Sequence, residues 1–511
     1  MTAINRPGRF VALCAAVLLS VASIAMAAQD DAKTSSAPSR EPTAETPPAL
    51  PAHVETHHTI QLGQKSLDYR AIAETIQLTS AKGEKTASVF TIAYIADPKP
   101  GQTRPVAFFF NGGPGAASVF LHLGAVGPRI MAPVPAGTVP NPPVQIIDNP
   151  STWLAFTDLV FVDPVGTGFS RGEGKDDNPS KPFFNVKSDI ESLDSVVRLW
   201  LTKHERWSSP VYLAGESYGG FRVAAMAKSL EREEGITPNG LVMISPALDW
   251  SMLNPGPGDL IAAAVNLPTF AASVAALNGD TKFDAAPVEK FALTDYLTGL
   301  AAVQGVPPPG DPFIAKVAAM IGLPDDIVRR ERGWVGKEVF AHELRRKEDQ
   351  VLSLYDATIT RAAPNNPWDP TAGDPVLDNA IAAYTAAFNA YAPEGLGYKT
   401  ELQYRTLPMS INHQWNFDGA REGQDGLGLP LSGLQTALLD HPQTKVLIVN
   451  GRYDLVTPYF ASRWLIDQLN IPDDVRKSIK IKVYDGGHMM YMRPDSRQAL
   501  ADDAAALFAA P

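Results

Sequence analysis

Short apolar runs alternate with amphipathic stretches along the first half of the chain. Between residues 186 and 204, apolar side chains from Ile190 to Leu201 recur at helical spacing, which predicts a helix with one face in the core. Continuous apolar runs, typical of strands covered on both faces, occur at 106–110, 159–162, 211–214 and 241–245. Strands that alternate with helices indicate a mostly parallel central sheet with helices on both faces, so the predicted fold class is α/β.

The pattern changes on either side of this part. Residues 75–78 and 87–94 are separated by a turn at 81–84, which predicts an antiparallel start to the sheet. Residues 250–438 carry Ala-rich helical stretches and Pro-rich joints with few strand-like runs, which predicts a helical cap insertion. The predicted core comprises residues 59–249 and 439–511, in which strand-like runs resume at 445–449 and 479–484.

The N-terminal residues have the layout of a secretory signal peptide. Arg6 and Arg9 precede an apolar run at 10–26, and small residues stand before Ala28, so residues 1–27 are predicted to be cleaved. A membrane anchor is the alternative, but the run is short for a spanning helix and no positive charge follows it. We therefore expect a periplasmic or secreted protein with no stable membrane anchor after cleavage.

Residues 28–58 are rich in Ala, Pro, Ser, Thr and Glu and hold almost no large apolar side chains, which predicts a disordered linker. The adjacent His57 and His58 would point in different directions on most backbones. No carboxylate cluster accompanies them, so we interpret them as solvated rather than as metal ligands.

Composition argues against several classes of function. A hydrophobic content of 45% and a charged content of 19% are ordinary for a globular chain of 511 residues. The net charge is −11 and no basic stripe is visible, so nucleic acid is not an expected partner. The single cysteine, Cys14, lies in the predicted signal peptide, so disulfides, metal thiolates and cysteine nucleophiles are not expected after cleavage. We expect neither a metal nor a cofactor.

Residues 215–219, Gly-Glu-Ser-Tyr-Gly, follow the apolar run 211–214 and precede a helical run at 220–227. A serine on such a strand-to-helix turn is held in a strained, exposed position, and the flanking glycines let other backbone pass close to it. The pattern is typical of a nucleophile elbow, with Ser217 as the candidate nucleophile.

A nucleophile of this kind needs an acid and then a histidine downstream, each after a later strand. Asp454 follows the run 445–449, and His488 follows the run 479–484. Taken alone, Asp454 fits a loop cap and His488 fits a surface turn. Their occurrence after apolar strands, in the order Ser, Asp, His, favours a catalytic triad. The turn at 111–115, Asn-Gly-Gly-Pro-Gly, directly follows a strand and fits an oxyanion loop.

The motifs together resemble the serine carboxypeptidase family (peptidase family S10) of the α/β-hydrolase superfamily. The run 90–94 and the stretch 451–458 look most like the bacterial branch. The matching segments, in family order, are residues 111–115, 163–170 (Asp-Pro-Val-Gly-Thr-Gly-Phe-Ser), 215–220, Asp454 and 487–489 (Gly-His-Met).

The resemblance implies roles that the chemistry also supports. Ser217 would attack the scissile carbonyl, His488 would take and return its proton, and Asp454 would hold the imidazole in the right tautomer. The amides of Gly113 and Tyr218 would bind the oxyanion.

The resemblance further implies a site for the terminal carboxylate of a peptide substrate, formed by Asn111, Gly112 and Glu216. A glutamic acid can bind a carboxylate only if one of the two is protonated, because like charges at that distance cannot both stay ionised. The alternative for Glu216 is a buried acid bonded to backbone.

Some positions depart from the family pattern. The family's Trp before the loop is Phe109, its Cys-Ser after the loop is Ala116-Ala117, and its second carboxylate-site Glu is Ala125. These departures spare the triad and affect the carboxylate network. His122 lies nearby and is either a substitute polar contact or a helix-face histidine.

The resemblance implies a serine-type carboxypeptidase that removes C-terminal residues from peptides through an acyl-enzyme, and the signal-peptide layout predicts that it is exported. One alternative is an esterase or acyltransferase with the same triad, because elbow chemistry is indifferent to the leaving group. A second alternative is a non-catalytic binding module, which would be expected to lack a triad residue or to block the elbow.

Overall fold

The computed structural model describes residues 50–51, 53–97, 103–134, 138–253, 255–256, 258–366, 372–420 and 427–509. The predicted signal peptide and most of the predicted linker lie outside these residues.

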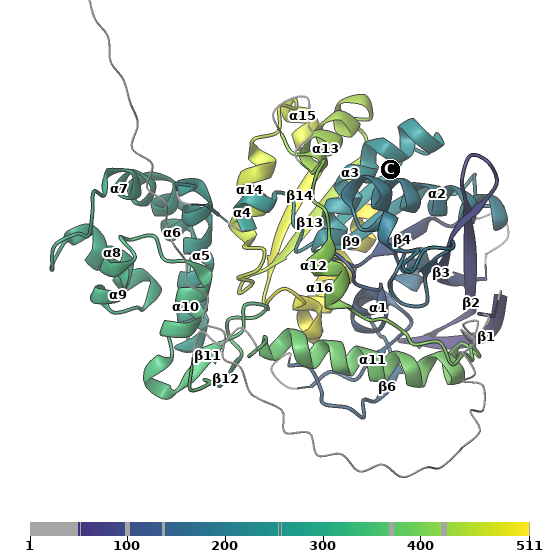
Figure 1. Ribbon diagram of the computed structural model, residues 1–511, viewed down its shortest axis with the longest axis horizontal. Coiled ribbons are helices and arrows are strands. Elements are labelled where there is room, and N and C mark those ends of the chain that lie inside the picture. Colours follow the sequence, from purple (N-terminus) through teal and green to yellow (C-terminus); the bar gives the residue numbers. More distant parts are fainter. Residues whose placement is uncertain are drawn as a thin grey trace, which may run out of the picture. The chain divides into compact units, whose positions relative to one another are not determined.

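A ten-stranded sheet forms the centre of the fold (Figure 1). Its order is β1-β2-β3-β7-β4-β9-β10-β13-β14, and β8 pairs with β3. The six strands from β7 to β14 run parallel to one another, whereas β1, β2 and β3 form the expected antiparallel start. The predicted α/β class with a mostly parallel sheet is therefore confirmed. The strands are β1 His53–Leu62, β2 Lys65–Thr79, β3 Lys85–Ala96, β4 Val106–Phe110, β7 Asp158–Val162, β8 Arg171–Gly172, β9 Val211–Glu216, β10 Gly240–Ile244, β13 Lys445–Gly451 and β14 Ile479–Tyr484, with a separate pair of β5 Arg129–Met131 and β6 Ile146–Asp148.

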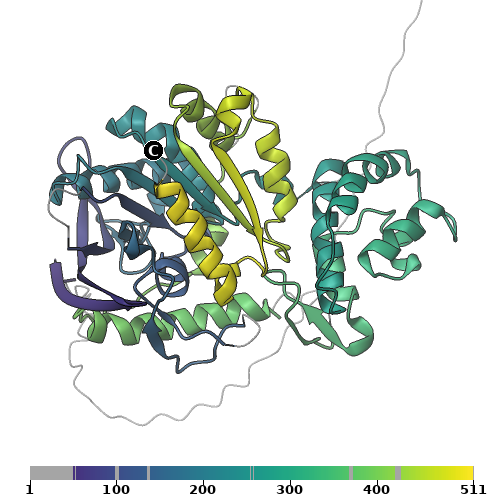
Figure 2. The ribbon, with the colours of Figure 1, turned by 180° about the vertical axis from the view of Figure 1, so that it is seen from behind.

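Helices cover both faces of this sheet. Helices α1, α11 and α16 supply side chains to the core cluster on one face, and α2, α3 and α13 supply the cluster on the other. Figure 2 shows α16 lying across the sheet. Helix α2 matches the helix predicted over 186–204. The helices are α1 Val119–Leu121, α2 Val186–Lys203, α3 Tyr218–Glu234, α4 Trp250–Leu253, α5 Leu260–Leu277, α6 Ala286–Phe291, α7 Leu297–Ala302, α8 Pro312–Ile321, α9 Asp325–Arg330, α10 Lys337–Glu343, α11 Pro375–Gly395, α12 Met409–Gln414, α13 Leu429–Asp440, α14 Tyr459–Asp467, α15 Asp473–Arg476 and α16 Pro494–Ala509.

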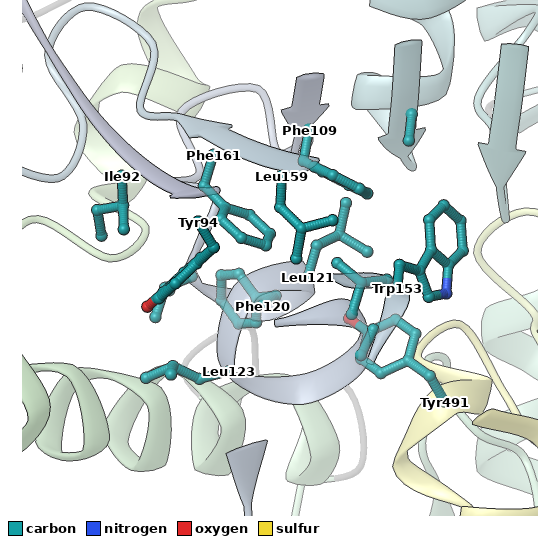
Figure 3. Packing of buried hydrophobic residues seen from close by; sticks show 14 of the residues in the cluster. Ile92, Tyr94, Phe109, Phe120, Leu121, Leu123, Trp153, Leu159, Phe161 and Tyr491 are labelled. Atoms are coloured by element: carbon teal, nitrogen blue, oxygen red, sulfur yellow. The ribbon is translucent and has the colours of Figure 1, made fainter. Parts of the chain in front are cut away.

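The central strands are apolar along their whole length because both of their faces are buried. In β4, Phe108 and Phe110 face one cluster and Phe109 faces the other. Phe109 stacks on Phe161 with ring centroids 4.9 Å apart and meets Trp153 edge-on at 5.6 Å (Figure 3). This packing fixes the end of β4, from which the glycine-rich turn at 111–115 leaves the sheet.

The segment 250–438 is mostly helical, but its helices do not share one core. Helices α5 to α10 share a third cluster with α14, whereas α11 and α13 pack on the two faces of the sheet. Strands β11 (Gln350–Leu352) and β12 (Thr360–Ala362) pair only with each other. Within the described residues, α5 is the one helix long and apolar enough to cross a membrane. Of its 18 residues 72% are buried, as in a core helix.

The prediction of a disordered linker over residues 28–58 is wrong for residues 53–58, which form part of a strand. Residues 53–58 are the first half of β1, which pairs antiparallel with β2 from His53 to Leu62. Its residues alternate between exposed and partly buried positions, because β1 is an edge strand with one face in solvent. A half-exposed edge strand needs few large apolar residues, so its composition resembles that of a linker.

Candidate functional site

Ser217 stands between β9 and α3, where the pentapeptide predicts it. Its φ of 59° and ψ of −124° are a strained combination for a residue with a side chain. The flanking glycines have no room for a side chain. A Cβ on Gly215 would lie 2.1 Å from the carbonyl oxygen of Gly219, and a Cβ on Gly219 would lie 2.1 Å from that of Phe110. The motif is therefore explained by close packing of β9, α3 and the end of β4 around the turn.

The structure brings His488 and Asp454 into contact. His488 Nδ1 lies 2.8 Å from Asp454 Oδ2, and both side chains are buried. The amides of Val456 and Thr457 donate to Asp454 Oδ1 at 2.8 and 2.9 Å, and the Thr457 hydroxyl donates to Oδ2 at 2.6 Å. These bonds fix the carboxylate, which in turn occupies Nδ1 of the imidazole. Nε2 is then the nitrogen that remains for Ser217, which lines the same cavity as His488.

The charge state of His488 reflects opposing effects. Burial lowers its pKa, but the charge and hydrogen bond of Asp454, together with the charge of Glu216, outweigh burial. The net result is a pKa raised above its usual value. An imidazole in this setting is a stronger proton acceptor than a free histidine.

The glycine-rich loop lies directly on the elbow. A Cβ on Gly112 would lie 2.5 Å from the amide nitrogen of Tyr218 and 2.9 Å from the Cβ of Ser217. Tyr218 is the first residue of α3, so its amide has no acceptor within the helix. Among the described residues, the Gly113 amide likewise donates no hydrogen bond. Gly112 therefore lies directly against the Tyr218 amide, and the structure shows no acceptor for the amides of Gly113 and Tyr218 among the described residues.

Glu216 is buried beside the nucleophile and bonded by side chains. Asn111 Nδ2 donates to Glu216 Oε2, and the Tyr491 hydroxyl lies 2.8 Å from Oε1 and 3.0 Å from Oε2. The amide of Leu121 donates to Asn111 Oδ1 at 3.0 Å, which orients the Asn111 side chain. The contacts of the Glu216 carboxyl in the described chain are therefore to side chains, in contrast to the backbone-bonded alternative.

Burial raises the pKa of Glu216 to about 7. The positive charge of His488 and the hydrogen bonds from Tyr491 and Asn111 lower it, and the charge of Asp454 raises it, but burial dominates. Glu216 is therefore a mixture of carboxylic acid and carboxylate near neutral pH.

These groups surround a cavity of about 50 Å³. Apolar side chains form much of its wall. The lining residues are Asn111, Gly112, Gly113, Ala116, Phe120, Glu216, Ser217, Tyr355, Leu377, Leu407, His488 and Met489.

A buried ion pair fixes the start of the loop. Arg222 of α3 bonds to both carboxyl oxygens of Asp189 of α2, at 2.7 and 3.1 Å, and also donates to the carbonyl oxygen of Asn111. No part of the Arg222 side chain is exposed. No sequence motif predicts this pair, because its two residues come from different helices.

His122 does not take the place of the missing acid. It is buried in the π-helix η1 (His122–Val126), its Nε2 lies 2.6 Å from the Tyr94 hydroxyl, and it does not line the cavity. Burial lowers its pKa to about 3, so it is a neutral core histidine. Ala125 lies in the same turn and is also buried. Sequence reasoning also missed Tyr491, three positions after His488, whose only sequence signal is that proximity.

The described part of the chain contains no group of three or more His, Cys, Asp or Glu side chains able to hold a metal ion.

The strand order, the strained serine after β9 and the acid and histidine after β13 and β14 define an α/β-hydrolase fold. Residues 78–239 match the model of the serine carboxypeptidase family. The match includes Ser217 and ends before Asp454 and His488. It supports this family for the chain, while the bacterial branch stays a prediction.

Curated relatives are similar over the same part. The chain is 27% identical over 184 residues to "Serine carboxypeptidase-like 16" of Arabidopsis thaliana. This alignment covers 33% of this chain and 39% of that protein. The chain is 30% identical over 162 residues to "Carboxypeptidase Y homolog" of Arthroderma benhamiae, covering 30% and 29%. The chain thus matches about two fifths or less of the length of these relatives.

The similar solved structures have low sequence identity and low TM-scores. The peroxisomal alpha-beta-hydrolase Lpx1 from Saccharomyces cerevisiae aligns over 90% of both chains with 11% identity and a TM-score of 0.36. The fold assignment rests on the strand order and the elbow rather than on this likeness.

Proposed function

We propose that this chain is a serine-type carboxypeptidase that hydrolyses the C-terminal residue of peptides. Ser217 attacks the scissile carbonyl while His488 takes its proton, and Asp454 keeps the imidazole oriented. The amides of Gly113 and Tyr218 bind the oxyanion of the tetrahedral intermediate. His488 then returns the proton to the leaving amine, and water, activated in the same way, releases the peptide from Ser217.

The observation that carries the exopeptidase proposal is the buried Glu216 at the elbow. In its protonated form it donates a hydrogen bond to the terminal carboxylate of the substrate, together with Asn111 and the Gly112 backbone. An ionised Glu216 would repel that carboxylate. With a pKa of about 7, the protonated form is abundant at neutral and mildly acidic pH.

An esterase or acyltransferase with the same triad is the second candidate. It is favoured by Ala125, which stands where the resemblance expects a second acid in the carboxylate network. Without a functioning carboxylate site, the chain would cleave ester or amide bonds of acyl compounds with no preference for a free C-terminus.

The test compares blocked dipeptides that differ only at the C-terminus, as free acid, amide and ester. We expect the free acid to be cleaved at its peptide bond with a higher kcat/KM than the peptide bond of the amide. Rapid ester hydrolysis with no cleavage of the free-acid peptide would replace the carboxypeptidase proposal with the esterase one. The Ser217→Ala variant is the control for contaminating hydrolases.

Export to the periplasm or the medium is part of this proposal, supported by Arg6, Arg9 and the apolar run that follows them. We expect the exported protein to begin near Ala28 and to resist thiol-alkylating reagents, because Cys14 is removed. Mass spectrometry of the exported protein tests this, and an intact N-terminus or a lipid on Cys14 would contradict it.

A further inference from the structure

Tyr491 contacts the carboxyl group of Glu216 directly. It lies in the single turn η7 (Met490–Met492), just after His488, and its ring and hydroxyl are buried. Its hydroxyl is within hydrogen-bond distance of both carboxyl oxygens of Glu216, at 2.8 and 3.0 Å. Together with the bond from Asn111, this holds the Glu216 carboxyl in one orientation beside Ser217.

Small residues in η1 leave the space that tyrosines fill. A Cβ on Gly124 would lie 3.0 Å from the Tyr491 ring and 2.1 Å from the hydroxyl of Tyr384. Ala125, the next residue, stands where the resemblance expects the second acid, and it is buried. Ala125 and Tyr491 belong to the same core cluster, part of which is drawn in Figure 3.

We propose that Tyr491 replaces the second acid as the positioning residue that holds Glu216 for binding of the substrate's terminal carboxylate. The inference rests on the proposed carboxypeptidase function.

A tyrosine differs from an acid in its protonation. Burial and the charge of Glu216 hold the pKa of Tyr491 well above its usual value, so it remains a donor throughout the working pH range. Two acids in contact would share one proton, whereas here Glu216 is the one acid in the network. The other titratable groups that interact with Glu216 are His488, Asp454, Tyr384 and Tyr355.

The experiment uses Tyr491→Phe, which removes the hydroxyl and keeps the buried ring. Its matched control is Tyr384→Phe, because the Tyr384 hydroxyl is equally buried nearby but bonds to the sulfur of Met492 rather than to Glu216. Each variant is combined with Ser217→Ala, and calorimetry gives Kd for benzyloxycarbonyl-Ala-Phe as the free acid and as its C-terminal amide. If Tyr491→Phe does not yield folded protein, Tyr491→Met takes its place, since it also lacks the hydroxyl.

We expect the preference for the free acid over the amide to fall about tenfold or more in Tyr491→Phe and to stay unchanged in Tyr384→Phe. In enzyme with Ser217 intact, the alkaline loss of free-acid hydrolysis should move to higher pH in Tyr491→Phe. The reason is that a bond stabilising the Glu216 carboxylate has been removed. Ester hydrolysis, which needs no carboxylate site, should show no such shift.

The outcomes separate this inference from the proposed function. If the Ser217→Ala protein shows no preference for the free acid, the carboxypeptidase proposal and this inference both fall. If it shows the preference and Tyr491→Phe retains it, only the role of Tyr491 is overturned. If both tyrosine variants weaken the binding of the free acid and of the amide equally, the role of Tyr491 is also overturned, because such a result reflects a loss of packing alone.

Discussion

The protonation of Glu216 should set the alkaline limit of peptide hydrolysis. The protonated form binds the substrate carboxylate, so activity on free-acid peptides is present below the pKa of Glu216 and lost as pH rises through it. His488 must be neutral to act as a base, so activity on every substrate is lost as pH falls through its raised pKa. Free-acid peptides should therefore give a bell-shaped profile, and C-terminal ester or amide substrates a profile that rises and stays high.

The magnitude follows from the pKa of about 7. At that pKa, about 90% of Glu216 is protonated at pH 6 and about 10% at pH 8. The assay measures kcat/KM, which reports the free enzyme, for matched free-acid and ester substrates at both pH values. The kcat/KM of the free acid is divided by that of the ester at each pH. This quotient is independent of the protonation of His488, which both substrates need in the neutral form. The quotient should fall about tenfold between pH 6 and pH 8.

Glu216→Gln provides the decisive comparison. An amide does not titrate, so the quotient of free-acid to ester activity should become independent of pH. The substitution also removes a negative charge that raises the pKa of His488, so the acid limb should move to lower pH for both substrates. A quotient that is already constant from pH 6 to pH 8 in the native enzyme, or that still falls in Glu216→Gln, would refute the reasoning.

Three further substitutions test the site and the core. Ser217→Ala should lower kcat by about four to six orders of magnitude at unchanged Tm, and a sulfonyl fluoride should no longer label the protein; a tenth of the native rate would contradict its role. Gly112→Ala places a Cβ 2.5 Å from the Tyr218 amide, so kcat should fall about 10²–10³-fold, as on loss of an oxyanion donor, and native kcat would argue against that placement. Asp194 is buried on α2 without a hydrogen bond of normal geometry in the described chain, and burial, only partly offset by Ser229, raises its pKa to about 8. Because the unfolded chain ionises near pH 4, this acid makes folding less favourable as pH rises from about 4 to 8, at about 1.4 kcal/mol per pKa unit. Asp194→Asn should thus raise the free energy of unfolding by a few kcal/mol at pH 8 and little at pH 4; denaturant titration showing equal changes at both would contradict this.

The sequence by itself determined the sheet and the approximate location of the chemistry. Strands such as 106–110 and 211–214 are apolar throughout because both faces are buried, and that pattern is visible without coordinates. The glycines around Ser217 can also be recognised from the sequence, because a turn that has no room for a Cβ permits only glycine. The edge strand β1 was missed over residues 53–58, since half of its side chains face solvent.

Only the tertiary structure decided how the site is completed. Tyr491 meets Glu216 across 275 positions of sequence, and their hydrogen bond joins η7 to the end of β9. Arg222, Asp189 and Asn111 come from two helices and a loop, and their hydrogen bonds have no sequence periodicity. Burial, which raises the pKa of Glu216, depends on the whole surrounding core rather than on neighbouring residues. Local patterns record what a residue's own backbone requires, whereas contacts between distant elements and the resulting electrostatics arise only when the chain is folded.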